Sequence, residues 1–212
     1  MKMNYRISAN VIRRLPRYLR RLDWLEKRQV EKVSSNELGG QMGLTASQIR
    51  QDLNCFGGFG QQGYGYNVRQ LKENIGDVLG LSETLTCVVV GAGNLGHALI
   101  SNFRFSECGF ELAAAFDTAP ELIGKEVAGT PILDAAGLGE YLKTHRVDVG
   151  VLTLPQAHTV DTALLLASSG VRGIWNFTGI DIYEDLGDTR VENVHLSDSL
   201  LTLGYYLRSQ SE

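Results

Sequence analysis

The chain contains few cysteines and lacks any long apolar run. Its three cysteines, Cys55, Cys87 and Cys108, are an odd number without metal-ligand spacing, so we expect a reduced protein with no metal site. No apolar run reaches the roughly 18 residues of a membrane-spanning helix. Residues 1–7 also lack the apolar core of a signal peptide. These absences predict a cytoplasmic protein without a membrane segment.

Acidic side chains are the minority in the first half of the chain, and basic side chains are the minority in the second half. The 212 residues include 20 Lys and Arg against 24 Asp and Glu, a formal net charge of −4. Residues 1–80 hold 13 basic and 7 acidic side chains, a net of +6, whereas residues 81–212 hold 7 and 17, a net of −10. This split predicts two domains and an anionic partner for the first, although a solvated basic helix face would explain the same charges.

The basic half predicts short helices joined by tight turns. Pro16 suits the first turn of a helix over residues 16–28, whose inward positions would be Leu19, Leu22 and Leu25. A second helix is expected from an N-cap at Ser35 to about residue 43, and residues 45–48 form a capping box that begins a third. Two short helices around a glycine turn form a helix-turn-helix pattern.

The third helix carries side chains suited to reading DNA. Its apolar residues Ile49, Leu53 and Phe56 recur at helical spacing and are expected to face inward. Amides, hydroxyls and guanidinium groups are the groups that read base edges in a major groove. The outward residues of these types are Ser47, Gln48, Arg50, Gln51 and Asn54. A merely solvated polar face would have the same composition.

A glycine-rich segment, "GGFGQQGYGYNV", occupies residues 57–68. So many glycines exclude a helix, because each one costs helix stability. We predict a hairpin that resembles the wing of a winged-helix domain, with Gln61 and Gln62 near its tip as candidate DNA contacts. Asn67 is then the expected cap of a linker helix that ends at Gly80.

The acidic half alternates strands and helices. The expected strands are residues 85–90, "ELAAAF", "VDVGVLTL" and "VRGIWNF". Helices are expected near residues 134–145 and 158–169. This alternation predicts a parallel sheet of the Rossmann type with right-handed crossovers. A further apolar helix over residues 197–208 comes after the sheet domain should be complete, so it is expected to pack against another surface.

Residues 91–96, "GAGNLG", are a dinucleotide fingerprint in its proper context. They follow an apolar strand, open a helix, and precede an acid, Asp117, at the end of the next strand. Asp117 is suited to accept hydrogen bonds from ribose hydroxyls and would repel a 2′-phosphate, which favours NAD(H) over NADP(H). The candidate cofactor-binding residues are Gly91, Ala92, Gly93, Asn94, Leu95, Gly96, Asp117, Pro155 and Asn176.

Three functions remain compatible with these residues. A small NAD-dependent dehydrogenase is one, but the chain after Phe177 is too short for a substrate domain, and His158 has no obvious charged partner. A nucleotide- or CoA-binding module with a protein-docking domain is another. The third is a DNA-binding protein whose dinucleotide half controls it, and we favour this one. No catalytic residue is therefore predicted.

The chain resembles the Rex family of redox-sensing transcriptional repressors over nearly its whole length. The segments that carry the resemblance are "IRRLPRYLRRL", "VSSNELGGQMGLTASQIRQDL", "FGGFGQQGYGYNV", "VVVGAGNLGHALI", "AAAFD", "GTPI", "LTLP" and "IWNFT". The resemblance implies a winged-helix domain over residues 1–80, a Rossmann domain over 81–194, and a dimerisation helix over 195–212 swapped onto the partner of a homodimer. It also implies a repressor that binds inverted repeats of double-stranded operator DNA when NADH is scarce and releases them when NADH binds.

This sequence departs from the family pattern at a few positions. Gln51, Gln61 and Gln62 stand where the family typically has basic residues, so we expect fewer phosphate contacts and a changed operator preference. Asn102 stands where many members carry a tyrosine, and His195 where they carry an aspartate, with Asp198 one turn later. Those family residues help to relay the state of the cofactor.

Overall fold

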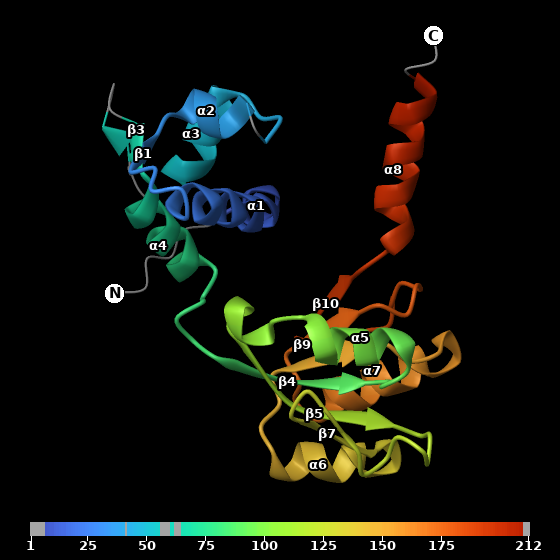
Figure 1. Cartoon of the computed structure of the whole chain (residues 1–212). Helices are drawn as coiled ribbons and strands as arrows, with labels where there is room; N and C mark the ends of the chain where they lie inside the picture. The colour runs from blue at the N-terminus through green and yellow to red at the C-terminus, as the bar shows by residue number, and fades with distance from the viewer. Residues whose placement is uncertain (1–6, 41, 56–59, 62–64, 210–212) are drawn as a thin grey trace. The chain divides into compact units, whose positions relative to one another are not determined.

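The computed structural model describes residues 7–40, 42–55, 60–61 and 65–209. The chain divides into two compact units, residues 1–83 and residues 84–212, and each is described by itself. The first unit contains helices α1 (Ala9–Glu26), α2 (Ser35–Gly40), α3 (Ala46–Asn54) and α4 (Val68–Val78) and three short strands (Figure 1). The second contains a seven-stranded sheet and helices α5 to α8.

Helix α1 begins seven residues earlier than the sequence predicts. Ser8 is its N-cap and accepts a hydrogen bond from the Val11 amide, so Pro16 lies inside the helix rather than in its first turn. A proline at this position leaves the carbonyl of Ile12 without its usual partner. Ile12 is exposed, so water can satisfy this carbonyl, and the helix continues because Val11 and Leu15 pack into the same core as its later turns.

Helices α2 and α3 form the predicted helix-turn-helix pair. The cap of α2 is Ser34, not Ser35, because Ser34 and Glu37 exchange reciprocal hydrogen bonds between side chain and backbone. Thr45 caps α3 as predicted and accepts a hydrogen bond from the Gln48 amide. Ile49 and Leu53 are fully buried, whereas Phe56 lies outside the described residues.

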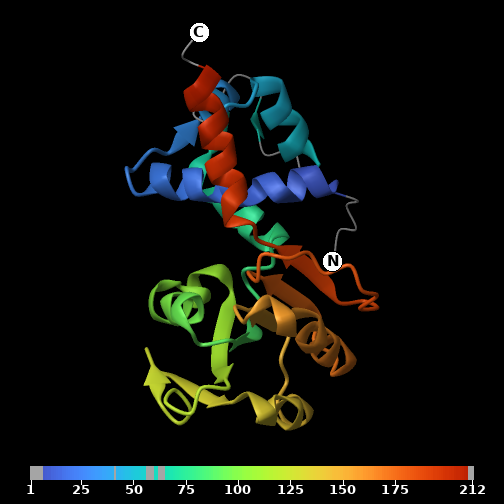
Figure 2. The same cartoon turned by 90° about the vertical axis from the view of Figure 1, so that its right-hand side faces the viewer.

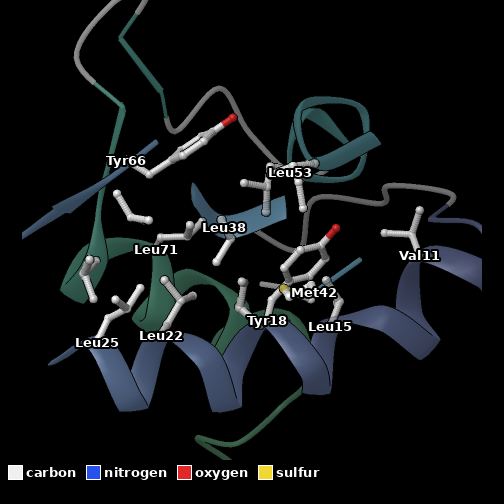
Figure 3. Close-up of a cluster of buried hydrophobic side chains, with 14 residues drawn as sticks. Val11, Leu15, Tyr18, Leu22, Leu25, Leu38, Met42, Leu53, Tyr66 and Leu71 are labelled. Carbon is white, nitrogen blue, oxygen red and sulfur yellow. The ribbon is translucent and has the colours of Figure 1, made fainter. Parts of the chain in front are cut away.

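A small antiparallel sheet completes this unit. Strands β1 (Lys32–Val33), β3 (Gly65–Asn67) and β2 (Gly60–Gln61) lie in that order, and the pairing of β2 with β3 agrees with the predicted hairpin. The tip of that hairpin, including Gln62, lies outside the described residues. Asn67 caps α4 as predicted. Figure 3 shows the core of this unit, in which Tyr18 and Leu22 of α1 meet Leu38 of α2 and Leu53 of α3.

The large sheet has the strand order β10-β9-β8-β4-β5-β7-β6. Its predicted strands are β4 (Leu85–Val90), β5 (Phe110–Asp117), β8 (Val149–Leu152) and β9 (Gly173–Asn176), all paired in parallel. Three strands were not predicted: β6 (Glu126–Val127), β7 (Thr130–Asp134) and β10 (Arg190–Asn193). Strand β6 pairs antiparallel with β7, while β7 and β10 extend the parallel sheet.

Helices cover both faces of this sheet (Figure 2). Helix α5 (Asn94–Asn102) packs Ile100 against Val89 and Val151 on one face. Helices α6 (Leu138–Thr144) and α7 (Thr159–Ser168) pack Leu142 and Leu166 into the core on the other. The two cores are built from alternate residues of β4, because successive side chains of a strand point to opposite faces.

Helix α8 (Leu196–Ser209) has no buried residue. Its exposed apolar side chains include Leu200 and Leu201, each 69% exposed, and Tyr205, which is 66% exposed. Figure 1 draws this helix in red after strand β10. A helix with this much exposed apolar surface is expected to have a further surface to cover it. Among the described residues, no helix is long and apolar enough to cross a membrane.

Candidate functional site

The parallel strands bring most of the predicted cofactor residues to one edge of the sheet. Val90 pairs with Leu152 and Phe116, and Leu152 pairs with Asn176, so the carboxyl ends of β4, β5, β8 and β9 meet there. Gly91 follows β4 directly, and Asp117 and Asn176 end β5 and β9. Ligands of open parallel sheets bind at this edge.

The glycines of the fingerprint have three different environments. Gly91 has a φ of 100°, a conformation that L side chains rarely adopt, and a Cβ there would meet the Thr153 backbone. A Cβ on Gly96 would collide with the Gly91 carbonyl oxygen. A Cβ on Gly93, in contrast, would meet no atom within 4 Å. Gly91 and Gly96 are therefore needed for folding, whereas Gly93 leaves open space beside the loop.

The N-terminus of α5 offers uncommitted hydrogen-bond donors to that space. Gly93 is the N-cap, and it supplies no side-chain acceptor for the first amides of the helix. These amides and the positive end of the helix dipole suit the phosphates of a nucleotide. The residues from Gly91 to Gly96 thus fit a dinucleotide diphosphate by both shape and charge.

Asp117 is tied to the glycine loop. Its Oδ2 accepts a 2.6 Å hydrogen bond from the Ala92 amide, and its Oδ1 accepts one of 2.9 Å from the Ala119 amide. A carboxylate has further lone pairs, so ribose hydroxyls can still donate to it. Asp117 is thus suited to two tasks, shaping the loop and accepting from a ribose.

Thr153 is a residue of this edge that the sequence analysis missed. Its hydroxyl donates a 2.6 Å hydrogen bond to the Gly91 carbonyl and fastens the loop after β4 to the end of β8. A hydroxyl residue one position beyond a strand that neighbours the fingerprint strand was the available signal. The sequence does not reveal which strands are neighbours, so the signal could not be read.

Asn176 and Pro155 differ in their surroundings. Asn176 is 1% exposed, and its amide is engaged by Ile180, Asn193 and Thr178. It holds the loop after β9 in place, so a cofactor would meet that loop rather than the Asn176 side chain. Pro155 is exposed at the start of the short helical turn before α7. Its ring is accessible at the same edge.

The outward face of α3 has the exposure that DNA reading requires. Ser47, Arg50, Gln51 and Asn54 are all exposed, and Gln48 is half-buried. The Arg50 guanidinium donates one 3.1 Å hydrogen bond, to the hydroxyl of Ser35 on α2. Because guanidinium has five N–H donors, Arg50 retains donors for a base or a phosphate. Gln61 lies in strand β2, but the structure does not describe its side chain.

The junction between β10 and α8 contains a hydrogen bond between His195 and Asp181. His195 Nε2 lies 2.8 Å from Asp181 Oδ1, and Tyr183 donates to the other oxygen of that carboxylate. The hydrogen bond to Asp181 raises the pKa of His195. Asn102, at the end of α5, donates to the Ala98 carbonyl on its own helix. In this chain His195 therefore interacts locally with its own subunit.

Comparison with known proteins gives two family models. Residues 6–54 match the family described as "Putative DNA-binding protein N-terminus", and residues 82–180 match the family described as "CoA binding domain". The first of these ranges contains α3 up to its last residue, and the second contains the fingerprint.

Relatives match nearly the whole chain. Redox-sensing transcriptional repressor Rex of Clostridium botulinum strain Alaska E43 is 48% identical over 210 residues, covering 99% of this chain and 100% of the relative. The repressor of the same name from Clostridium botulinum strain Hall is 50% identical over 197 residues, covering 93% of each chain.

Two solved structures match closely in fold. RSP in complex with β-NADH is 42% identical, with a TM-score of 0.90, and the match covers 97% of this chain and 96% of that one. RSP in complex with β-NAD⁺ and operator DNA is 45% identical, with a TM-score of 0.88, and the match covers 97% and 94%.

Proposed function

The chain belongs to the Rex family of redox-sensing transcriptional repressors, and we propose that α3 reads its operator while the fingerprint edge binds its cofactor. The protein is a repressor rather than an enzyme, its cofactor is NAD(H), and its partner is operator DNA. The observation that carries the proposal is the pairing of a helix-turn-helix with an open fingerprint loop in one chain that matches these repressors end to end.

At the cofactor edge, each part of NADH has a suitable partner. The α5 amides would hold the diphosphate, Asp117 would accept from the adenosine ribose, and the loops after β8 and β9 would face the nicotinamide half. The protein would recognise NADH by its shape and charge and would not remove a hydride from it, because the protein is a sensor and not an enzyme. CoA shares an adenine nucleotide and a diphosphate with NADH, so it is the control ligand for the specificity of the response.

The DNA-binding unit would be residues 1–80, followed by the cofactor domain over 81–194 and the dimerisation helix over 195–212. In a homodimer, α8 of each subunit would pack on its partner, which explains its exposed leucines. A symmetric dimer presents two recognition helices, and inverted repeats match that symmetry. A repressor of this kind acts on chromosomal DNA, and we accordingly propose a cytoplasmic location.

Release of DNA requires a ligand that distinguishes two states of the dimer, because equal binding to both shifts nothing. NADH at one fingerprint would draw the two cofactor domains together across the partner's α8. The two α3 helices would then leave the separation of about 34–36 Å that successive major grooves on one face demand. Low NADH would restore that separation.

The test of this function is selection of bound sequences from random duplex DNA by the intact protein, repeated with NAD⁺, NADH and CoA. We expect inverted repeats to be enriched without NADH, to be released on adding NADH, and to be unaffected by CoA. A protein that enriches no sequence, or whose binding ignores saturating NADH, would contradict the proposal.

Replacing Arg50 with alanine should weaken operator binding by about 1–3 kcal/mol and relax the preference at one base pair, if its free donors reach a guanine. The matched control is Arg69→Ala on α4, which removes an exposed arginine already paired with Glu73. Fluorescence anisotropy on the selected operator measures both variants. Equal affinity and unchanged specificity in Arg50→Ala would remove this side chain from the reading face.

Replacing Asp117 with alanine should weaken NADH binding by at least about tenfold and narrow its advantage over NADPH. The variant loses the ribose acceptor, the repulsion of a 2′-phosphate, and the acceptor of the Ala92 amide. Asp117→Asn keeps the size of the side chain and one acceptor oxygen. It should therefore reduce the preference for NADH over NADPH with a smaller loss of NADH affinity than Asp117→Ala. Fluorescence titration of each protein with NADH and with NADPH measures both affinities. If the unmutated protein binds NADPH as tightly as NADH, the role assigned to Asp117 is wrong.

A further inference from the structure

The recognition helix α3 carries a buried carboxylate on its inner face. Asp52 is 1% exposed and lies between α3 and α1. It accepts two hydrogen bonds from the Arg14 guanidinium, at 2.6 and 2.7 Å, and one of 2.7 Å from the Tyr18 hydroxyl. A fourth, of 2.8 Å, comes from the side-chain amide of Gln48 on α3 itself.

Asp52 is ionised at neutral pH. Burial alone would raise its pKa, but the hydrogen bonds from Arg14, Tyr18 and Gln48 outweigh burial and hold the pKa below its usual value. Burial and the bond to Asp52 raise the pKa of Tyr18, so its hydroxyl stays protonated and remains a donor. All four hydrogen bonds therefore point toward a fixed negative charge.

This charge determines how the Gln48 amide is oriented. An ionised carboxylate only accepts hydrogen bonds, so the amide must direct an N–H, and not its carbonyl oxygen, at Asp52. Its carbonyl oxygen and its second N–H have no other partner among the described residues. Gln48 is the third residue of α3, and the N-terminal residues of a recognition helix are the ones that meet base edges.

We propose that Asp52 is a positioning residue that presents Gln48 as the reader of one adenine in each operator half-site. A glutamine that keeps one acceptor and one donor matches the N6 donor and N7 acceptor of adenine in the major groove. Because its rotamer is already held, little side-chain entropy is lost on binding. The proposal rests on operator binding through α3, as proposed above.

Gln51 differs from Gln48 in this respect. It is exposed on the same helix, and the described residues form no hydrogen bond with its side chain. Its amide can turn either edge to DNA, so it adds contact without a fixed base preference. Two glutamines three residues apart therefore have different roles, because only Gln48 of the two donates a hydrogen bond to Asp52.

The test is selection from random duplex DNA, without NADH, for the intact protein, three variants and one control variant. Gln48→Met should abolish one adenine preference per half-site, lowering discrimination there by about tenfold or more, with the other positions kept. Asp52→Asn should lose the preference at the same position. Adding Asp52→Asn to Gln48→Met should cost no further discrimination there, because Asp52 acts through Gln48. The control is Gln70→Met, which removes an exposed glutamine of α4 and should leave the profile unchanged.

Asp52→Asn weakens a buried ion pair, so circular dichroism must first show that it folds. If Asp52→Asn does not fold, Gln48→Asn tests the positioning of the amide instead. The shorter asparagine side chain cannot reach both Asp52 and a base, so this variant should lose the adenine preference. An adenine preference that survives in Gln48→Met, in folded Asp52→Asn or in Gln48→Asn overturns the inference, as does a Gln48-dependent position that selects another base. Unmutated protein that enriches no sequence instead overturns DNA binding itself.

Discussion

Replacing Gly93 with valine should abolish the response to NADH and leave operator binding intact. The added side chain enters the open space beside the fingerprint loop, where the diphosphate would lie, and its Cβ meets no atom within 4 Å. Gly93 has a φ of −64°, outside the left-handed region that favours glycine. We expect NADH affinity to fall by at least about a hundredfold, equivalent to about 2.7 kcal/mol.

The contrast with Gly96 is the internal control for this experiment. A Cβ at Gly96 collides with the Gly91 carbonyl oxygen, so Gly96→Val should lower the melting temperature and impair the whole cofactor domain. Gly93→Val should melt like the unmutated protein. Calorimetric titration with NADH, followed by operator binding with and without NADH, separates the two variants. Release of DNA by NADH from Gly93→Val would show that the diphosphate lies elsewhere.

Adding charge to the apolar residues of α8 should dissociate the dimer and with it the operator complex. Leu200 and Leu203 are 69% and 52% exposed in the single chain, and each buries apolar surface if a partner covers it. Burying one leucine is worth about 1.5–3 kcal/mol, and a symmetric dimer buries each position twice. Leu200→Glu with Leu203→Glu should therefore weaken dimerisation by more than about a hundredfold.

The matched control places the same charges on the polar residues of the helix. Ser199→Glu with Thr202→Glu adds two carboxylates to α8 and keeps all its leucines. Sedimentation equilibrium gives the dimer constants, and affinity for an inverted repeat should fall in parallel in the leucine variant only. Deleting residues 197–212 should have the same effect, with NADH binding retained weakly. A dimeric deletion variant that still releases DNA on adding NADH would exclude α8 as the coupling element.

Sequence patterns predicted the strands whose apolar pattern is strong. They did not predict strands that are stabilised mainly by hydrogen bonds to a neighbouring strand. Strands β4 and β5 are largely apolar. Strand β4 was predicted with correct ends, and β5 begins at Phe110, one residue before its predicted start. Strand β10 reads Arg-Val-Glu-Asn and has a single apolar residue, so only its hydrogen bonds to β9 identify it. Pro16 is the opposite case, a strong local signal for a helix start that the core packing of Val11 overrides.

The candidate site shows the same division between local and distant information. The fingerprint and Asp117 follow a spacing that a single sequence reveals. No sequence pattern marks Asp52, because Arg14, its principal partner, lies 38 residues earlier in the chain. Gln48 looked like half of a capping box, yet its side chain turns to Asp52. Long-range ion pairs of this kind become visible only when the chain is folded.

Two hydrogen bonds within the chain hold the fingerprint loop in place, and this affects how fast NADH can bind. The Thr153 hydroxyl holds the Gly91 carbonyl and Asp117 holds the Ala92 amide, so the chain itself keeps the loop in the shape that we propose binds the diphosphate. A preformed site needs no ordering step, and association then proceeds as fast as ligand and site meet in the right orientation. The lifetime of the NADH complex therefore sets the delay between a fall in cellular NADH and renewed repression.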